Sequence, residues 1–298
     1  MNHEELLAYY RAPGIFTGLE GFEDAVDAIP GDIASIASVV QGLLIHEALA
    51  PAYKVELSPE QHAQKQLHSA VAMLSCATRI ATSPLSESRV PGQRVVGVCR
   101  HFATLFVAIL RHKGIPARAR CGFANYFEPG KHVDHWVGEY WNAEQNRWIL
   151  VDAQVDSHQR DWYKPNFDTL DVPRDRFLVA GDAWRACRSG AEDSNSFGVS
   201  GTNMWGIVEV FGDLFQDLAA LQKIELLPWG WYGLATDDSN CILEEDLMDE
   251  LALLSSAADA VALERLSEML AADIRVRMPP ETIEKVVQAD RTFVASVA

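Results

Sequence analysis

The sequence lacks the short motifs by which many proteins hold metals and nucleotides. It contains no CxxC pair, no HExxH segment, no Walker-type phosphate loop and no GxGxxG turn. The acidic stretch 237–240 also lacks the glycine and the terminal glutamate of a calcium-binding loop. We therefore expect the protein to need no metal ion and no other cofactor.

Long apolar runs and positive charge are also scarce. No stretch of about eighteen uninterrupted apolar residues occurs, and residues 1–6 lack the basic and then apolar segments of a secretory signal. The 25 Lys and Arg residues face 42 Asp and Glu residues, a formal net charge of −17. This charge repels phosphate backbones and anionic lipids. We expect a cytoplasmic protein whose partners are neither nucleic acid nor membrane.

Cysteine is rare, and its pattern does not suggest disulfides. An odd number of five cysteines is scattered over the chain without paired spacing. We expect all of them to be reduced. Those without an activating pattern nearby are predicted to be packing thiols: Cys76, Cys121, Cys187 and Cys241.

The chain does contain enough apolar material for a large core, since 48% of its residues are hydrophobic. We divide it into three segments that are expected to pack as one globular unit. Residues 1–58 are predicted to form short helices broken at Pro13–Gly14 and Pro30–Gly31. Residues 59–175 are predicted to form the catalytic core, and residues 176–298 a mainly helical extension.

The core segment is predicted to begin with helices and continue with strands. Ser58 as a cap, with Gln61 three residues later, predicts one helix that ends before Ser83–Pro84. Apolar residues then repeat at helical spacing from Cys99 to Lys113–Gly114. A helix followed by antiparallel strands indicates an α+β fold. The predicted strands span residues 117–126, 133–141 and 147–153.

The extension contains two unusual segments between its helices. Segment 189–202 is rich in Ser, Gly, Asp and Asn and is the best candidate for a mobile loop or linker. The cluster Pro-Trp-Gly-Trp-Tyr-Gly at 228–233 forms either a buried aromatic corner or a pocket wall, and we favour the corner. The predicted helices span residues 177–188, 203–225, 244–255, 257–272 and 280–297.

Cys99 is the candidate nucleophile. It stands at or beside a predicted helix N-terminus, where unpaired backbone N–H groups and the helix dipole stabilise a thiolate. His101 lies on another side of this helix and is predicted to be exposed or to cap it. His132 and Asp134 are predicted to be rim or loop residues.

The candidate base follows from the expected strand register. If the hairpin turns between Ala143 and Glu144, His135 lies directly opposite Asp152, with Cβ atoms roughly 4.5–5.5 Å apart. A carboxylate in that place would hold one tautomer of the imidazole and stabilise its protonated form.

Four short segments form a pattern when taken together: GVCRHFA at 97–103, LRHKGIPAR at 110–118, HWV at 135–137 and WILVD at 148–152. In order and spacing they resemble the bacterial transglutaminase-like superfamily over about residues 60–160. The resemblance implies a papain-like core in which Cys99, His135 and Asp152 match the family's nucleophile, base and orienting acid. Its members include transglutaminases, peptidases, amidases, amide-forming enzymes and proteins with dead sites, so the fold alone selects no reaction.

Acyl transfer also needs donors for the developing oxyanion, and the backbone N–H of Cys99 is the natural first one. Gln93, six residues earlier, has the spacing of the oxyanion glutamine in papain-like proteases and is the predicted second donor. Trp136, next to the base, is predicted to belong to the core or to wall the substrate cleft.

We therefore expect a cysteine enzyme that attacks an amide or peptide carbonyl and forms a thioester. Hydrolysis is the first choice because water is always available and no amine site is evident. A transglutaminase or amide-forming enzyme with an amine acceptor is one alternative, and a noncatalytic binding or scaffold protein that retains the fold is another. The sequence leaves open the substrate, the oligomeric state, the role of the extension and whether the site is covered.

Overall fold

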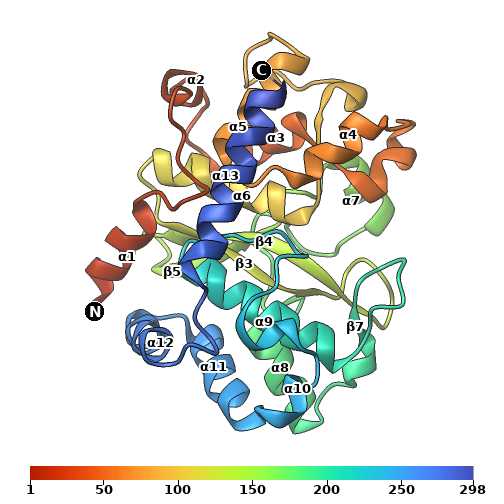
Figure 1. Ribbon diagram of the computed structural model, residues 1–298. Helices are drawn as coiled ribbons and strands as arrows, with labels where there is room; N and C mark the ends of the chain where they lie inside the picture. The colour runs from red at the N-terminus through yellow and green to blue at the C-terminus, as the bar shows by residue number, and fades with distance from the viewer. Residues whose placement is uncertain (298) are drawn as a thin grey trace.

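The computed structural model describes residues 1–297 and places a β-sheet between two groups of helices (Figure 1). The strand order is β5–β4–β3–β6, with antiparallel neighbours, and β7 pairs in parallel with the start of β4. The fold is therefore α+β, as the sequence predicts. The strands are β3 (Ala117–Ala124), β4 (His132–Asn142), β5 (Arg147–Val151), β6 (Phe177–Val179) and β7 (Phe197–Gly198).

The segment before the sheet is mainly helical. Two short strands, β1 (Leu44–His46) and β2 (Val95–Gly97), form a separate parallel pair in it. The α-helices are α1 (His3–Arg11), α2 (Glu23–Asp27), α3 (Ile33–Leu43), α4 (Pro59–Ala63), α5 (Ala70–Ile80) and α6 (Cys99–His112). Short 3-10 helices are η1 (Glu47–Tyr53), η2 (Gln64–Gln66) and η3 (Pro91–Gln93) here, and η4 (Ser194–Ser196) and η5 (Gly233–Thr236) later.

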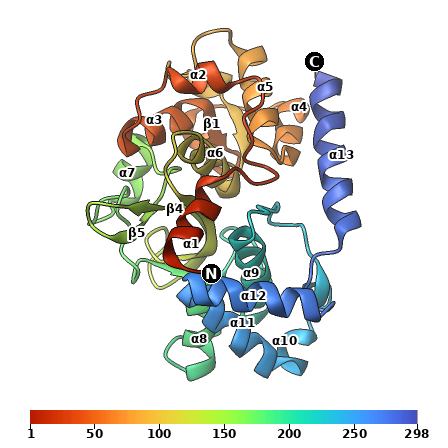
Figure 2. The ribbon, with the colours of Figure 1, turned by 90° about the vertical axis from the view of Figure 1, so that its left-hand side faces the viewer.

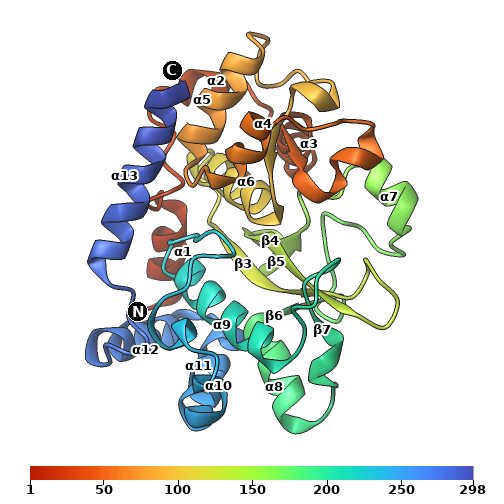
Figure 3. The same cartoon turned by 45° about the vertical axis from the view of Figure 1, so that its right-hand side comes forward.

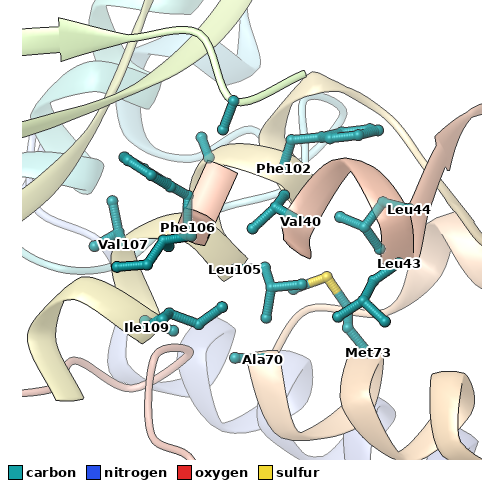
Figure 4. Close-up of a cluster of buried hydrophobic side chains, with 14 of the residues drawn as sticks. Val40, Leu43, Leu44, Ala70, Met73, Phe102, Leu105, Phe106, Val107 and Ile109 are labelled. Carbon is teal, nitrogen blue, oxygen red and sulfur yellow. The ribbon is translucent and has the colours of Figure 1, made fainter. Parts of the chain in front are cut away.

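Helix α6 is the central element of the larger core. Its apolar side chains are buried between α3, α5 and the sheet, and Figure 4 shows Leu105 and Phe106 among side chains of these helices. Phe106 can lie directly on β4 because Gly138 has no side chain: a Cβ there would be 2.5 Å from the Phe106 ring. This close contact holds the start of α6 in a constant position beside the sheet.

The predicted helix after Ser58 is divided in two. Ser58 and Gln61 form the expected capping box, but α4 ends at Ala63. Gln64 then turns its side-chain oxygen to the backbone N–H of Val96 at 2.8 Å, and Ser69 caps the new helix α5. The prediction of one continuous helix was wrong because these two polar side chains satisfy the backbone groups at the break.

The predicted hairpin register was also wrong, by two residues. In the structure Asn142 pairs with Arg147 and Gly138 with Val151. The Asn142 side chain accepts hydrogen bonds from the N–H groups of residues 144 and 145, and Asn146 adopts a left-handed φ of 51°. The loop between paired residues is two residues longer on the β5 side than expected. An even shift leaves every side chain on its predicted face.

The segment after the sheet packs on it through buried ion pairs. Arg120 on β3 contacts both Glu139 on β4 and Asp217 on α9, and all three side chains are buried. Helix α13 then returns to pack along α5, as Figures 2 and 3 show. The helices of this part are α7 (Ser157–Tyr163), α8 (Ala180–Ser189), α9 (Ile207–Leu221), α10 (Asn240–Leu243), α11 (Glu245–Ala257), α12 (Ala260–Ala272) and α13 (Pro280–Val297).

Two predictions for this segment need correction. Residues 177–179, expected to begin a helix, pair with β3 as the edge strand β6. The polar segment 189–202 contains β7, which pairs with the start of β4. Among the described helices none is long and apolar enough to cross a membrane.

Candidate active site

Cys99 is the first residue of α6, directly after the cap residue Val98. The backbone N–H groups of Arg100 and Trp136 donate hydrogen bonds to its sulfur. The second of these belongs to the peptide bond that joins His135 to Trp136, so the sulfur lies against the chain at His135. Only 7% of Cys99 is exposed.

The thiol is held in its neutral form in the resting structure. Burial raises the pKa of Cys99 well above its ordinary value, and the negative charge of Asp134 raises it further. The hydrogen bonds from the two backbone N–H groups lower the pKa but do not outweigh burial. The thiolate expected from the helix N-terminus alone is therefore not the resting state.

His135 and Asp152 form a hydrogen bond of 2.9 Å between Nε2 and a carboxylate oxygen, and both side chains are buried. The predicted register, which placed His135 directly opposite Asp152, is incorrect. They meet nonetheless because the shift is even and because Asp152, one residue beyond β5, turns back toward β4. The phenol of Tyr126 donates to the same carboxylate oxygen at 2.7 Å.

Both carboxylate oxygens of Asp152 accept hydrogen bonds. Its other oxygen accepts the backbone N–H groups of Gln154 at 3.0 Å and Val155 at 3.3 Å. Burial alone would raise the pKa of Asp152, but the nearby His135 and the hydrogen bonds outweigh it and hold the pKa below its ordinary value. The acid is therefore ionised at neutral pH and fixed in orientation.

Cys99 and His135 line the same cavity, which has a volume of about 550 Å³. Its walls come from segments far apart in the sequence: the end of β1, the start of α6, the start of β4, the segment after β7, α9 and residues 228–231. Phe127 packs edge-on against the imidazole with ring centroids 4.8 Å apart. The cavity thus brings a thiol and an oriented imidazole to one accessible space.

Residues 58–153, which include all three of these side chains, match the Transglutaminase-like superfamily. This part of the chain is similar to a transglutaminase-like domain, and the match confirms the family resemblance of the sequence over these residues.

Other comparisons add little beyond the family. No curated protein matches the chain. A solved structure described as a "Putative Cysteine Protease" from Cytophaga hutchinsonii aligns at 16% identity with a TM-score of 0.36. The alignment covers 60% of this chain and 46% of that chain, so the similar part is less than half the length of that protein.

Two predicted residues of the transglutaminase-like domain lie away from the cavity. Gln93 is exposed at the end of η3, and the strand β2 separates it from Cys99. Trp136 is 1% exposed and packs in the core with α6, because it lies on the strand face opposite to His135. Neither the oxyanion prediction for Gln93 nor the cleft prediction for Trp136 is correct.

His46 lies beside the domain's cysteine instead. It ends β1, where it pairs with Gly97 of β2, and it lines the cavity. Its Nδ1 accepts the backbone N–H of Ala48 at 3.2 Å. Burial lowers the pKa of His46 to about 4, so the ring is neutral at pH 7 and carries its proton on Nε2. The sequence analysis did not find this residue, because no local pattern links positions 46 and 99.

Five carboxylic acids also line the cavity, and three of them interact with one another: Asp134 on β4, and Glu209 and Asp213 on α9. The other two are Glu47 and Glu128. Asp134 was predicted to be a rim or loop residue, but it lines the cavity with Cys99 and its charge raises the pKa of that thiol. Glu209 and Asp213 stand four residues apart in the first half of a mainly apolar helix, a signal that could have been noticed in the sequence. Donor atoms of Asp134, Asp213 and Cys121 lie within 4.8 Å of one another, a set that could hold a metal ion.

The remaining sequence predictions concern aromatic and histidine side chains. Trp229 and Trp231 line the cavity, so the favoured interpretation of 228–233 as a buried corner was wrong.

His101 is completely buried, and its Nδ1 accepts the N–H of Val98 at 3.1 Å. The capping role predicted for it is correct and the exposure is not. His132 stacks on Phe197 with ring centroids 4.3 Å apart.

Proposed function

We propose that the protein is a cysteine-dependent acyl-transfer enzyme that hydrolyses an amide or peptide bond, with Cys99 as nucleophile, His135 as base and Asp152 as orienting acid. The observation that carries the proposal is the buried hydrogen bond between His135 Nε2 and Asp152, in the cavity that Cys99 lines. A structural histidine would not need to face a thiol across an open space. The proposal extends to a cytoplasmic enzyme that acts without metal or other cofactor.

The direction of proton transfer follows from the tautomer. Because Nε2 of His135 donates to Asp152, Nδ1 of the neutral ring is the free base. The neutral thiol of Cys99 gives its proton to this nitrogen as the sulfur attacks the substrate carbonyl. Asp152 stabilises the resulting imidazolium, which then protonates the leaving amine. Water, activated by the same nitrogen, hydrolyses the thioester.

The oxyanion needs two donors near the sulfur. The backbone N–H of Cys99 belongs to the first turn of α6, where N–H groups have no partner within the helix. We assign the second donor to the Nε2–H of His46 in place of Gln93. Its support is the accepting Nδ1 and the neutral ring, which together leave Nε2 as the donor that faces the cavity wall.

The proposal is tested with p-nitrophenyl acetate, an uncharged acyl donor. We expect release of p-nitrophenolate and an acetyl group on the Cys99 peptide, detected by mass spectrometry. Cys99→Ala should abolish the adduct, and His135→Ala should slow acylation at least about a hundredfold because the base is lost. Cys187→Ala, which removes a partly buried thiol outside the cavity, is the matched control and should change nothing.

The alternatives give different results in the same assay. Acetylation of Cys99 no faster than that of free cysteine would contradict the enzyme proposal and favour a binding or scaffold protein. If the acetyl-enzyme transfers its acyl group to an added amine such as glycinamide in preference to water, the reaction is amide transfer and not hydrolysis.

A further inference from the structure

The cavity beside Cys99 contains a cluster of carboxylic acids without a cationic partner. Asp134, Glu209 and Asp213 form no ion pair with a Lys or Arg side chain within residues 1–297. Asp134 and Asp213 are hydrogen-bonded to each other, and Asp213 is only 6% exposed. One further carboxylate oxygen of each is buried without a hydrogen-bond partner. Buried carboxylates are normally paired with a cation, so this cluster lacks its usual counter-charge.

The basic side chain that interacts with the cluster already has another partner. His135 lies close enough to Asp134 to lower its pKa, but its Nε2 is engaged by Asp152. Burial is the main reason that the pKa values are raised, to about 6 for Asp134 and about 7 for Glu209, and that of Asp213 is raised well above its ordinary value.

Aromatic rings form the wall next to these acids. Trp229 and Trp231 are 42% and 38% exposed, and both line the cavity. The ring of Trp231 lies directly on α9 at Gly212, the residue before Asp213. This contact is possible because Gly212 has no side chain: a Cβ there would be 2.7 Å from the ring. A tryptophan face next to a carboxylate is the environment that organic ammonium groups prefer.

We propose that the cavity is a specificity site for a positively charged organic group, such as an alkylammonium or guanidinium, on the substrate that acylates Cys99. The inference rests on the proposed function and names the class of substrate. Asp134, Glu209 and Asp213 bind the charge, and Trp229 and Trp231 cover its apolar side.

A divalent metal ion fits this environment less well. The cavity volume of about 550 Å³ far exceeds that of an ion, and indole rings offer a metal no ligand. Cys121 could complete a metal site with Asp134 and Asp213, and manganese chloride is therefore included in the test.

The test measures how the charge of a thiol reagent affects its reaction with Cys99. Three methanethiosulfonates of similar length are compared, with a trimethylammonioethyl, a hydroxyethyl or a sulfonatoethyl group. In each reaction the Cys99 thiolate attacks the sulfenyl sulfur, a mixed disulfide forms and methanesulfinate leaves. The ratio of cationic to neutral rate does not depend on how much thiolate is present. We expect this ratio to be about tenfold or more at low salt.

The decisive variant is Asp134→Asn with Asp213→Asn, which removes both carboxyl groups of this hydrogen-bonded pair and keeps the shape of both side chains. It should lower the ratio to nearly one. Asp246→Asn with Glu284→Gln is the matched control, since both residues are exposed and lie on helices that do not line the cavity. It changes the net charge by two units and should leave the ratio within about twofold of its original value.

Protection experiments provide the second measurement. Phenethylammonium should protect Cys99 from the neutral reagent, and phenylethanol, of the same shape without charge, should not. Equal rates for all three reagents, or equal ratios in the two double variants, would overturn the inference. Protection by manganese chloride without protection by phenethylammonium would overturn it in favour of a metal site.

Failure of this inference is distinguishable from failure of the proposed function. If Cys99 is acetylated by p-nitrophenyl acetate but shows no charge preference, only the cation site is wrong. If Cys99 is not acetylated, the proposed enzyme is wrong, whatever the charge preference.

Discussion

At the scale of single residues, hydrogen bonds restrict the side chains of the candidate site to single conformations. Asp152 accepts four hydrogen bonds, from His135, Tyr126 and the N–H groups of Gln154 and Val155. A carboxylate with four donors has one orientation, and it transmits that orientation to the imidazole. Tyr126 is therefore a positioning residue that acts on His135 through Asp152.

Tyr126→Phe should shift the pH dependence of acylation. The phenol is one of the groups that hold the pKa of Asp152 below its ordinary value, so its loss should raise that pKa. Asp152 would then be protonated at higher pH, and the acid limb of the rate profile with p-nitrophenyl acetate should move to higher pH.

Tyr163→Phe is the matched control for this prediction. Tyr163 lines the same cavity and contacts Phe127, but its hydroxyl is not among the hydrogen-bond donors to Asp152 within residues 1–297. Its profile should keep the original acid limb. An unchanged acid limb in Tyr126→Phe would show that the phenol does not position the acid.

At the scale of elements, the sheet is joined to the following helices by buried charge. Arg120 on β3 makes two hydrogen bonds to Asp217 on α9, at 2.9 and 2.8 Å, and one to Glu139 at 3.2 Å. It also donates to the backbone oxygen of Ser255 on α11. This arrangement holds α9 on the sheet, and α9 supplies Glu209 and Asp213 to the cavity.

Arg120→Met should therefore lower the free energy of unfolding strongly, by about 3–5 kcal/mol, because Asp217 is left buried without its counter-ion. Denaturant unfolding measures the change. Arg147→Met on β5 is the control, since Arg147 pairs with Asp171 at the surface, where both side chains are more than 40% exposed. That variant should lose less than about 1 kcal/mol. Similar losses in both variants would contradict the assignment of the network.

The hairpin between β4 and β5 shows what local patterns can and cannot predict. Alternation correctly identified the two strands and the faces of His135 and Asp152. The turn was misplaced because the Asn142 side chain and the left-handed Asn146 select a longer loop than the polar composition suggests. The predicted pairs of residues between β4 and β5 were therefore wrong, while the predicted contact between His135 and Asp152 was correct.

At the scale of the whole molecule, α13 connects the two groups of helices on either side of the sheet (Figure 2). Its Asp290 accepts the backbone N–H of His68 at 2.7 Å and the hydroxyl of Ser69. Ser69 is also the cap of α5. One carboxylate thus fixes the last helix to the start of α5, far away in the sequence.

Asp290→Ala should release α13 from α5 without disturbing the sheet. We expect a loss of about 1–3 kcal/mol in unfolding free energy, because the buried N–H of His68 loses its acceptor. Hydrogen exchange followed by mass spectrometry should become faster in α13 and in the first turn of α5. Glu284→Ala, an exposed acid on the same helix, should leave exchange unchanged. Unchanged protection in Asp290→Ala would mean that apolar packing alone holds the helix.

The sequence by itself determined the α+β fold, the helix that begins at Cys99, and the pairing of His135 with Asp152. These features follow from the spacing of apolar residues, from helix caps and from the family resemblance. All three can be recognised within a few residues or along adjacent strands. It could not place Gln93, because the surroundings of that side chain depend on which elements pack against it. For Trp136 strand alternation favours the core, one of the two predicted positions.

Only the tertiary structure decided the composition of the cavity. His46 comes from β1, the acids from β4 and α9, and the tryptophans from segment 228–231. These groups meet because buried contacts such as Phe106 on Gly138 and Arg120 with Asp217 set the positions of whole helices. Burial then changes the proton affinity of Cys99 and of the acids, and burial is a property of the folded chain and not of any local segment.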